Sequence, residues 1–214
     1  MSNPLDQVGA VSRALESTER DGAPARVLSA TRTYPVPALD VWDALTDRDR
    51  IARWFLPVTG DLRLGGRYQL EGNAGGTVET CDPPHSFSVT WEFGGDVSWV
   101  TVTLTPNGDD TTLELRHTAH VTPERWAEFG PGATGVGWDG MLLGLLLHLT
   151  TGGFRDPSEA AAWTASDEGV AFLAGSSEAW GDAAVAAGDD PAAARAAAAR
   201  TTAAYTGRPL PEDP

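Results

Sequence analysis

A regular alternation of apolar and polar side chains runs through the first half of the chain and predicts short strands with one buried face. It is clearest over residues 86–93, where the apolar positions are Phe87, Val89, Trp91 and Phe93. Five more strands are expected, over residues 26–34, 67–71, 77–81, 98–105 and 111–121. Turns such as Pro106-Asn107-Gly108-Asp109-Asp110 separate them, and connections this short indicate antiparallel pairing.

Helical spacing replaces the alternation in the most apolar run of the chain, residues 137–149. As a helix, this run places on one face, or beside it, Trp138, Met141, Leu142, Leu145, His148 and Leu149. It is far shorter than the roughly 20 residues of a membrane-spanning helix, so we expect a core helix and no membrane partner. Two short helices are expected after the first strand, over residues 38–45 and, capped by Thr46, residues 47–54.

The two ends of the chain carry additional predicted elements. Residues 3–19 are expected to form a helix that begins at Asn3 and Pro4, and residues 20–25 a linker. Residues 152–166 are expected to be a loop, followed by a helix from Ser166 to Trp180 and another from Asp190 to Tyr205. The predicted division is an N-terminal helix and linker (1–25), a central domain (26–151), a C-terminal helical extension (152–207) and an irregular tail (208–214).

Composition mainly excludes classes of partner and cofactor. With 41% hydrophobic residues the chain can bury a sizeable core, and a net charge of −15 disfavours nucleic acid and anionic membranes as partners. The single cysteine, Cys81, and the absence of a secretory pattern at Met1 favour a reducing, cytoplasmic location. The four histidines show no zinc-site spacing, and the paired glycines lack the Lys and Ser/Thr of a phosphate loop, so neither metal nor cofactor is expected.

The order of strand, two short helices, several antiparallel strands and a long final helix resembles the helix-grip arrangement of the START-like (SRPBCC) superfamily. More narrowly, the sequence is similar to the bacterial family named after the C-terminal domain of the heat-shock-protein ATPase activator. The similarity covers roughly residues 26–151 and rests on Val41-Trp42-Asp43-Ala44-Leu45-Thr46, Trp54-Phe55, Gly65-Gly66, Gly75-Gly76-Thr77-Val78-Glu79, Pro83-Pro84, Leu113-Glu114-Leu115-Arg116-His117 and Gly137-Trp138. The resemblance implies an α+β fold, in which a curved antiparallel sheet wraps around a long helix, and a cavity between the two for an apolar or aromatic small molecule.

The residues expected around that cavity are large apolar side chains and one histidine: Trp54, Phe87, Trp91, His117, Trp138, Met141 and Leu145. Any one of the aromatic residues is more often part of a filled core, but eight tryptophans in a modest domain favour a lined pocket. His117 ends the apolar alternation of the last strand. It is either a hydrogen-bonding group for a ligand, an acid or base, or a residue bonded to a neighbouring strand.

Three functions follow from these features. The leading hypothesis is a cytoplasmic small-molecule binding protein. The second is an enzyme of the cyclase, dehydratase or hydrolase kind found elsewhere in the superfamily, with His117 as acid or base. The third is a co-chaperone-like interaction module, in which the terminal helices bind a protein partner or a second copy of the chain.

Overall fold

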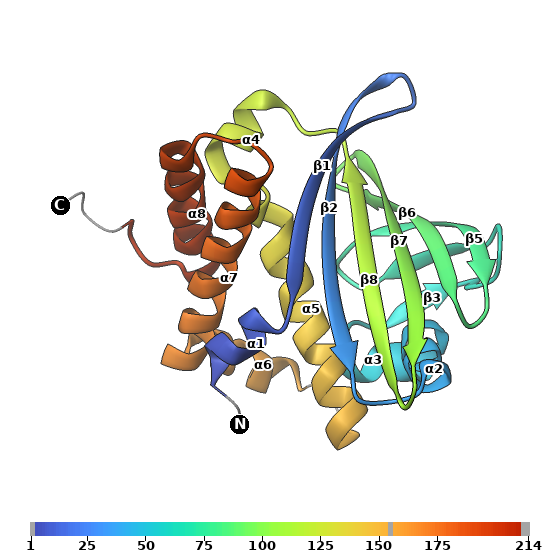
Figure 1. Cartoon of the computed structure of the whole chain (residues 1–214). Coiled ribbons are helices and arrows are strands. Elements are labelled where there is room, and N and C mark those ends of the chain that lie inside the picture. Colours follow the sequence, from blue (N-terminus) through green and yellow to red (C-terminus); the bar gives the residue numbers. More distant parts are fainter. Residues whose placement is uncertain (1–2, 154–155, 211–214) are drawn as a thin grey trace. The chain divides into compact units, whose positions relative to one another are not determined.

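The computed structural model describes residues 3–153 and 156–210 and contains an eight-stranded antiparallel sheet (Figure 1). The strand order is β1-β2-β8-β7-β6-β5-β4-β3, so β1 and β3 form the edges. The strands are β1 (Ser12–Arg20), β2 (Ala23–Tyr34), β3 (Val58–Gly60), β4 (Arg67–Leu70), β5 (Gly75–Asp82), β6 (Ser86–Phe93), β7 (Asp96–Asn107) and β8 (Asp110–Ala119). All six expected strands are present, and β1 and β3 are additional.

The sheet curves around the long helix α5 (Gly132–Thr151), which confirms the α+β helix-grip fold. The remaining helices are α1 (Pro4–Gly9), α2 (Ala38–Thr46), α3 (Arg48–Trp54), α4 (Pro123–Phe129), α6 (Pro157–Ala165), α7 (Asp167–Ala186) and α8 (Pro191–Thr206). None of the helices among the described residues is both long and apolar enough to cross a membrane.

The chain divides into two compact units. The first comprises Met1–Ala30, Val121–Gly140 and Asp156–Pro214, and the second comprises Thr31–His120 and Met141–Arg155. Strand β2 and helix α5 each begin in the first unit and end in the second. The four-part division expected from the sequence stays a prediction.

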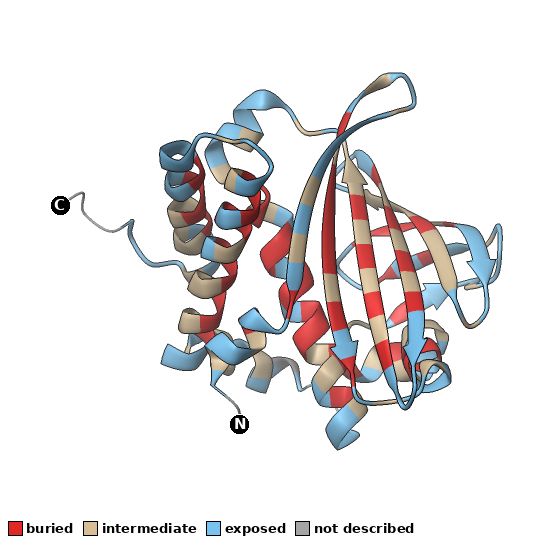
Figure 2. Cartoon of the chain, in the orientation of Figure 1, coloured by how far each residue is buried: buried red, intermediate tan, exposed pale blue. Residues whose placement is uncertain are grey.

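Alternation of burial along β7 and β8 explains why these strands were predictable. Side chains on one face are buried and those between them are partly exposed, as the red and tan bands of Figure 2 show. The buried positions, which form the inner face of the sheet in the second unit, are Ser98, Val100, Val102, Leu104, Thr111, Leu113, Leu115 and His117. The Tyr34 hydroxyl donates to the Leu142 carbonyl of α5 at 3.1 Å, which ties β2 to this helix.

Helices α2 and α3 form as expected, but a different residue caps the second one. The Asp47 carboxylate accepts from the Arg50 N–H at 2.9 Å, whereas the Thr46 hydroxyl donates back to the Trp42 carbonyl at 2.8 Å. Thr46 is therefore the last residue of α2, and Asp47 supplies the N-terminal acceptor of α3.

The N-terminal expectation of one helix over residues 3–19 is wrong beyond Gly9. Asn3 caps α1 as expected, but the chain leaves the helix after Gly9 and forms β1. Residues 21 and 22, expected within a linker, turn β1 into β2 with φ values of 51° at Asp21 and 76° at Gly22. Two positive φ angles in a two-residue Asp-Gly turn are typical of a hairpin, which is why β1 becomes the neighbour of β2.

The expected loop over residues 152–166 is also wrong in part, because α6 occupies Pro157–Ala165. The Asp156 carboxylate caps it by accepting from the Ser158 and Glu159 N–H groups. The next two helices agree with their predicted caps, since Ser166 caps α7 and Asp190 caps α8. In the tail expected from Arg208 onward, residues 211–214 lie outside the described part of the chain.

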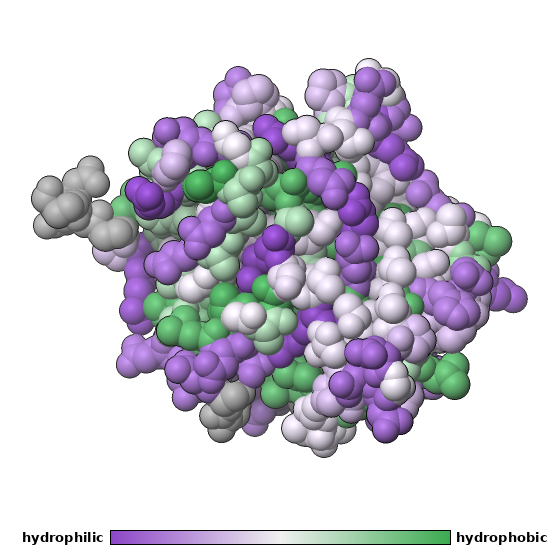
Figure 3. All heavy atoms as spheres, viewed as in Figure 1, coloured by the Kyte–Doolittle hydropathy of each residue, from purple (hydrophilic) through white to green (hydrophobic). Residues whose placement is uncertain are grey.

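Within the first unit, α7 and α8 lie side by side and a groove of about 560 Å³ runs between them. Alanine contributes four of its lining residues, and its charged residues are Glu178, Asp182, Arg195 and Arg208. Over the coloured residues of Figure 3, purple and green are interspersed on the visible face. Within residues 5–15 and 170–205, at the two ends of the chain, the exposed large apolar residues are Leu5 and Tyr205.

Candidate functional site

The inner face of the second unit is arranged in rows across β6, β7 and β8. One row is Phe87, Val102 and Leu115, and the next is Val89, Val100 and His117. In the third row Trp91 pairs with Ser98. The face is therefore apolar in the first of these rows and becomes polar in the next two, where His117 and Ser98 lie.

The aromatic residues of β6 are less buried than the rest of this face. Val89 is 9% exposed and Val100 is 3% exposed, whereas Phe87 and Trp91 are only half-buried. Phe87 meets Trp42 of α2 edge-on, with ring centroids 6.0 Å apart. Phe93, the last apolar position of the alternation, is 59% exposed where β6 turns into β7.

His117 forms a buried pair with Ser98. Its Nε2 lies 2.8 Å from the Ser98 Oγ, and the Ser98 hydroxyl donates to the Trp91 carbonyl at 3.1 Å. A serine has one proton, so with that proton on the Trp91 carbonyl the imidazole is the donor to Oγ. Burial lowers the pKa of His117 to about 4, and the ring is neutral at pH 7.

Trp54 is buried between the short helices rather than presented as an open surface. Its indole N–H donates to the Ala44 carbonyl of α2 at 2.9 Å, and its ring stacks on Phe55. A methyl group at Gly144 of α5 would lie 3.3 Å from the Trp54 carbonyl oxygen, so α3 and α5 approach closely here. These contacts are those of a packing residue, and a role in ligand binding stays a prediction.

The candidates on α5 are all buried, but they belong to different units. Met141 and Leu145, 8% and 0% exposed, lie in the second unit with the sheet residues. Trp138, 7% exposed, lies in the first unit. The structure therefore brings Phe87, Trp91, His117, Met141 and Leu145 into one unit together with Trp54.

His148, expected on or beside the apolar face of the helix, is buried. Its Nδ1 lies 3.2 Å from the Gly153 carbonyl oxygen, and the Arg50 Nε–H points to its Nε2 at 3.5 Å. Arg50 also pairs with Asp40 at 3.2 Å. This histidine thus closes the last turn of α5 and is bonded to α3.

The strand carboxylates occupy the outer face, as expected. Glu92 pairs with Arg67 at 2.8 Å, and this guanidinium holds the pKa of the carboxyl below its usual range. Glu71, Glu79 and Cys81 are exposed. Among the described residues no cluster of three or more His, Cys, Asp or Glu side chains is placed to hold a metal ion.

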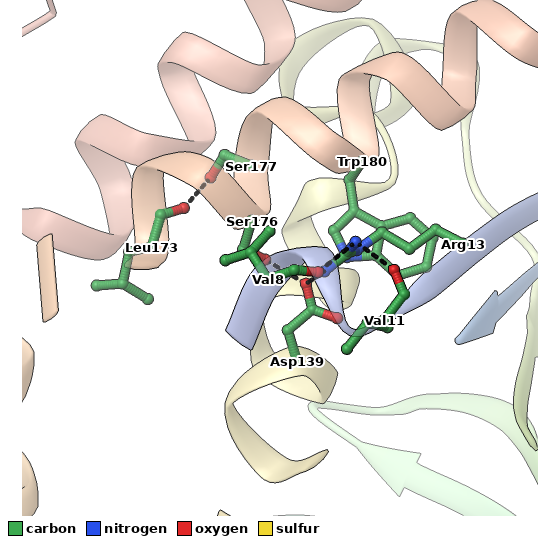
Figure 4. A network of polar contacts seen from close by, with 8 residues as sticks. All are labelled: Val8, Val11, Arg13, Asp139, Leu173, Ser176, Ser177 and Trp180. Carbon is green, nitrogen blue, oxygen red and sulfur yellow. Dashed lines mark hydrogen bonds and ion pairs between the residues drawn. The ribbon is translucent and has the colours of Figure 1, made fainter. Parts of the chain in front are cut away.

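The first unit contains a buried ion pair that the sequence reasoning missed (Figure 4). Arg13 of β1 reaches Asp139 of α5, with its Nη2 2.8 Å from Oδ2, and the two side chains are 6% and 1% exposed. Two residues of α7 add donors to the same oxygen, the Ser176 hydroxyl and the Trp180 indole N–H. Arg13 also donates to the carbonyls of Val8, in α1, and of Val11, just after α1.

Four donors converge on Asp139 Oδ2: the Arg13 Nε–H and Nη2–H, the Ser176 hydroxyl and the Trp180 indole N–H. Oδ1 is buried and has no hydrogen-bond partner among the described residues. Burial raises the pKa of this carboxyl above its ordinary value, while Arg13 and the hydrogen bonds from Ser176 and Trp180 act to lower it. The Arg13 guanidinium supplies the counter-charge, so Arg13 and Asp139 form a buried ion pair.

Signals for these missed residues were present in the sequence. Asp139 is the single charged residue in the apolar run 137–149, and a lone carboxylate there needs a cationic partner. Ser98 occupies an inward position of the alternation that continues through Val100 and Val102. Neither sequence feature identifies the partner, because Arg13 and Asp139 are 126 positions apart.

Comparison with known proteins places this fold in a family. The family model described as activator of Hsp90 ATPase homolog 1-like protein matches residues 35–148, more than half of the chain. A search of curated proteins returned no match.

Solved structures agree with that assignment. CalU16 from Micromonospora echinospora is 32% identical in its solution structure, with a TM-score of 0.69 over 84% of this chain and 97% of CalU16. Its crystal structure gives 30% identity and a TM-score of 0.66 over 84% and 99% of the two chains. DynU16, a protein of the dynemicin biosynthetic locus, shares the fold at 22% identity, with a TM-score of 0.54 over 59% and 48%.

These findings define an α+β protein of the helix-grip type. The chain belongs to the family of activator of Hsp90 ATPase homolog 1-like proteins.

Proposed function

We propose that this chain is a cytoplasmic small-molecule binding protein that holds an apolar or aromatic ligand between the inner face of its sheet and the second half of α5. The groups that would contact the ligand are Phe87, Trp91, His117, Met141 and Leu145. Trp54 completes the proposed set through α3, and a role for Trp138, which lies in the first unit, stays a prediction.

One observation carries this proposal. Phe87 and Trp91 lie on the buried face of the sheet, yet they stay half-buried while the valine between them is closed off. Aromatic surface that remains accessible beside an apolar core is the kind of surface that an aromatic ligand covers with a gain in free energy. Family membership supports the same function, because the resemblance implies a ligand cavity between sheet and final helix.

The chemistry of His117 favours binding over acid–base catalysis. The imidazole is neutral and bonded to Ser98, whose own proton lies on the Trp91 carbonyl. With its Nε2–H donated to Ser98, this nitrogen is protonated and is not a base, and burial lowers the pKa of the ring to about 4, well below the operating pH that suits a general base. The enzyme hypothesis and the interaction-module hypothesis rest on no comparable observation.

A thermal-shift screen of aromatic and polycyclic compounds tests the proposal. A ligand present at 100 times its Kd stabilises the native protein by about 2.7 kcal/mol, which is readily measured as a rise in Tm. Trp91→Ala is expected to abolish this rise. Trp99→Ala is the matched control, since Trp99 lies on the adjacent strand with its side chain on the opposite face.

Two results would contradict the proposal. The first is that no compound of the screen raises the Tm of the wild-type protein. The second is that Trp91→Ala and Trp99→Ala reduce the ligand-induced rise equally, because the effect would then come from general destabilisation.

A further inference from the structure

Ser98 and His117 form a polar pair on the inner face, and the buried positions of β2 include a further polar residue, Arg32. Ser98 and His117 lie diagonally across β7 and β8, in the row of Trp91 and in the row next to it. Two other buried hydroxyl groups are hydrogen-bonded to the backbone. Tyr34 donates to the Leu142 carbonyl, and Thr111 donates to the Val36 carbonyl. The Ser98–His117 pair is instead two side chains bonded to each other.

The hydrogen-bond donor and acceptor positions of Ser98 determine which ligand groups this pair can bind. A serine hydroxyl has one donor and two acceptor positions. The donor is used on the Trp91 carbonyl, and one acceptor position receives the His117 Nε2–H. One acceptor position remains at Oγ, on a residue that is 9% exposed and in the same row as the half-buried indole of Trp91.

We infer that Ser98, held by His117, is a specificity-determining hydrogen-bond acceptor for a neutral hydroxyl group on an aromatic ligand, a phenol-type O–H. This inference rests on the proposed function, because it assigns the orientation of a ligand that lies along Phe87 and Trp91. The ring covers the aromatic surface of β6, and the hydroxyl donates to the Ser98 Oγ.

Charge distinguishes the expected ligand from other polar aromatic compounds. The Ser98–His117 pair is uncharged at pH 7, so a carboxylate placed beside it would lose its hydration without gaining a counter-ion from either group. A carbonyl oxygen, which only accepts, would compete with Trp91 for the single serine proton. A neutral hydroxyl satisfies the remaining acceptor with no such loss.

Three naphthalene derivatives test the inference by isothermal titration calorimetry at pH 7: 2-naphthol, the nearly isosteric 2-methylnaphthalene and the anion 2-naphthoate. In the wild-type protein the hydrogen bond is expected to favour 2-naphthol. The ratio of the affinities for 2-naphthol and 2-methylnaphthalene is expected to fall about fivefold in Ser98→Ala, which corresponds to the loss of one net hydrogen bond. 2-Naphthoate is expected to bind most weakly.

Two further variants keep the result interpretable. Ser98→Thr retains a hydroxyl at this position and is expected to restore the ratio. Thr101→Ala removes a hydroxyl from the outer face of the same strand and is expected to leave the ratio unchanged. These comparisons separate a hydrogen bond to the ligand from a general effect on β7.

The outcomes separate this inference from the proposed function. If 2-naphthol and 2-methylnaphthalene both bind and Ser98→Ala leaves their ratio unchanged, the inference is overturned and the binding function stands. If 2-naphthoate binds more tightly than 2-naphthol, the inference is overturned as well. If none of the three compounds binds, the proposed aromatic ligand site and the inference fall together.

Discussion

At the scale of single residues, His117 shows how a sheet position changes the chemistry of a side chain. The ring lies among valine and leucine side chains on the inner face and is bonded to the neutral hydroxyl of Ser98. Burial disfavours the charged form of the ring and so lowers its pKa, and the ring stays neutral at pH 7. The histidine therefore acts as an uncharged polar group throughout the physiological pH range.

Protonation of His117 is expected to make stability depend on pH. The folded protein has a pKa of about 4 at this residue, against an ordinary value of 6.5. Below pH 6.5 the unfolded chain binds a proton that the folded protein does not, so stability present at neutral pH is lost as the pH falls from 6.5 to about 4. The full shift corresponds to about 3 kcal/mol.

Urea unfolding of the wild-type protein and of His117→Gln across this pH range measures the effect. As the pH falls, the wild type is expected to lose about 3 kcal/mol of its free energy of unfolding relative to His117→Gln. His85→Gln, at an exposed position between β5 and β6, is the control for replacing a histidine by glutamine. Parallel curves for wild type and His117→Gln would contradict the prediction.

At the scale of elements, α5 combines an apolar surface with glycines that have different neighbours. A methyl group at Gly135 would lie 2.3 Å from the Trp180 ring, so this glycine allows α7 to approach α5. Gly140, five residues later in the same helix, has nothing within 4 Å of the corresponding point. One glycine is required by packing, and the other only lowers helix propensity.

Alanine substitutions at Gly135 and Gly140 are expected to change the free energy of unfolding in opposite directions. Gly135→Ala forces the Trp180 ring aside and is expected to destabilise the protein by about 1–3 kcal/mol. Gly140→Ala places a better helix former at an open position and is expected to stabilise by about 0.5–1 kcal/mol. Chemical denaturation of both variants checks this, and equal effects of the same sign would show that packing at Trp180 is not limiting.

The strands and helices that the sequence predicted are those that bury one face, because burial of one face produces a regular pattern of apolar residues. Strands β6, β7 and β8 alternate because one face is covered, and α5 has a continuous apolar face. Strand β1 has no such alternation, since most of its residues are exposed on both faces, and it is a strand because the Asp21-Gly22 turn returns it to β2. Pairing partners are a tertiary property that the local pattern does not encode.

The candidate site was predictable to the same extent. Placement of Phe87, Trp91 and His117 on the inner face follows from period-two alternation. Their degree of burial and the bond from His117 to Ser98 depend on the register of β7 and β8, which pairs Val100 with His117. A shift of one residue in that register would have separated the two polar side chains, and the sequence alone does not fix it.

At the scale of the whole molecule, Asp139 collects contacts from segments that are far apart in the chain. Arg13 comes from the N-terminal strand, and Ser176 and Trp180 come from a helix beyond the matched family region. The N-terminal and C-terminal additions are therefore joined to α5 through one carboxylate. They are parts of a compact unit and not independent appendages.

Asp139→Asn is expected to destabilise the protein strongly, because it leaves the buried Arg13 guanidinium without a counter-charge. The expected loss is about 3–5 kcal/mol in the free energy of unfolding, measured in urea. Asp182→Asn, on the exposed side of α7, is the matched control and is expected to change stability by less than about 0.5 kcal/mol. Replacing both partners by apolar residues, as in Arg13→Met with Asp139→Leu, is expected to recover much of the loss.

The edges of the sheet have a consequence for how the molecule behaves at high concentration. Strand β1 is nine residues long and lies at one edge, while the other edge is the three-residue strand β3. A long edge strand is a template on which another chain can add its own strand and begin an aggregate. Glu16 and Glu19 are exposed along β1, and charged side chains on an edge strand disfavour its pairing with a second chain. These residues are therefore expected to oppose polymerisation of the folded protein through its own sheet.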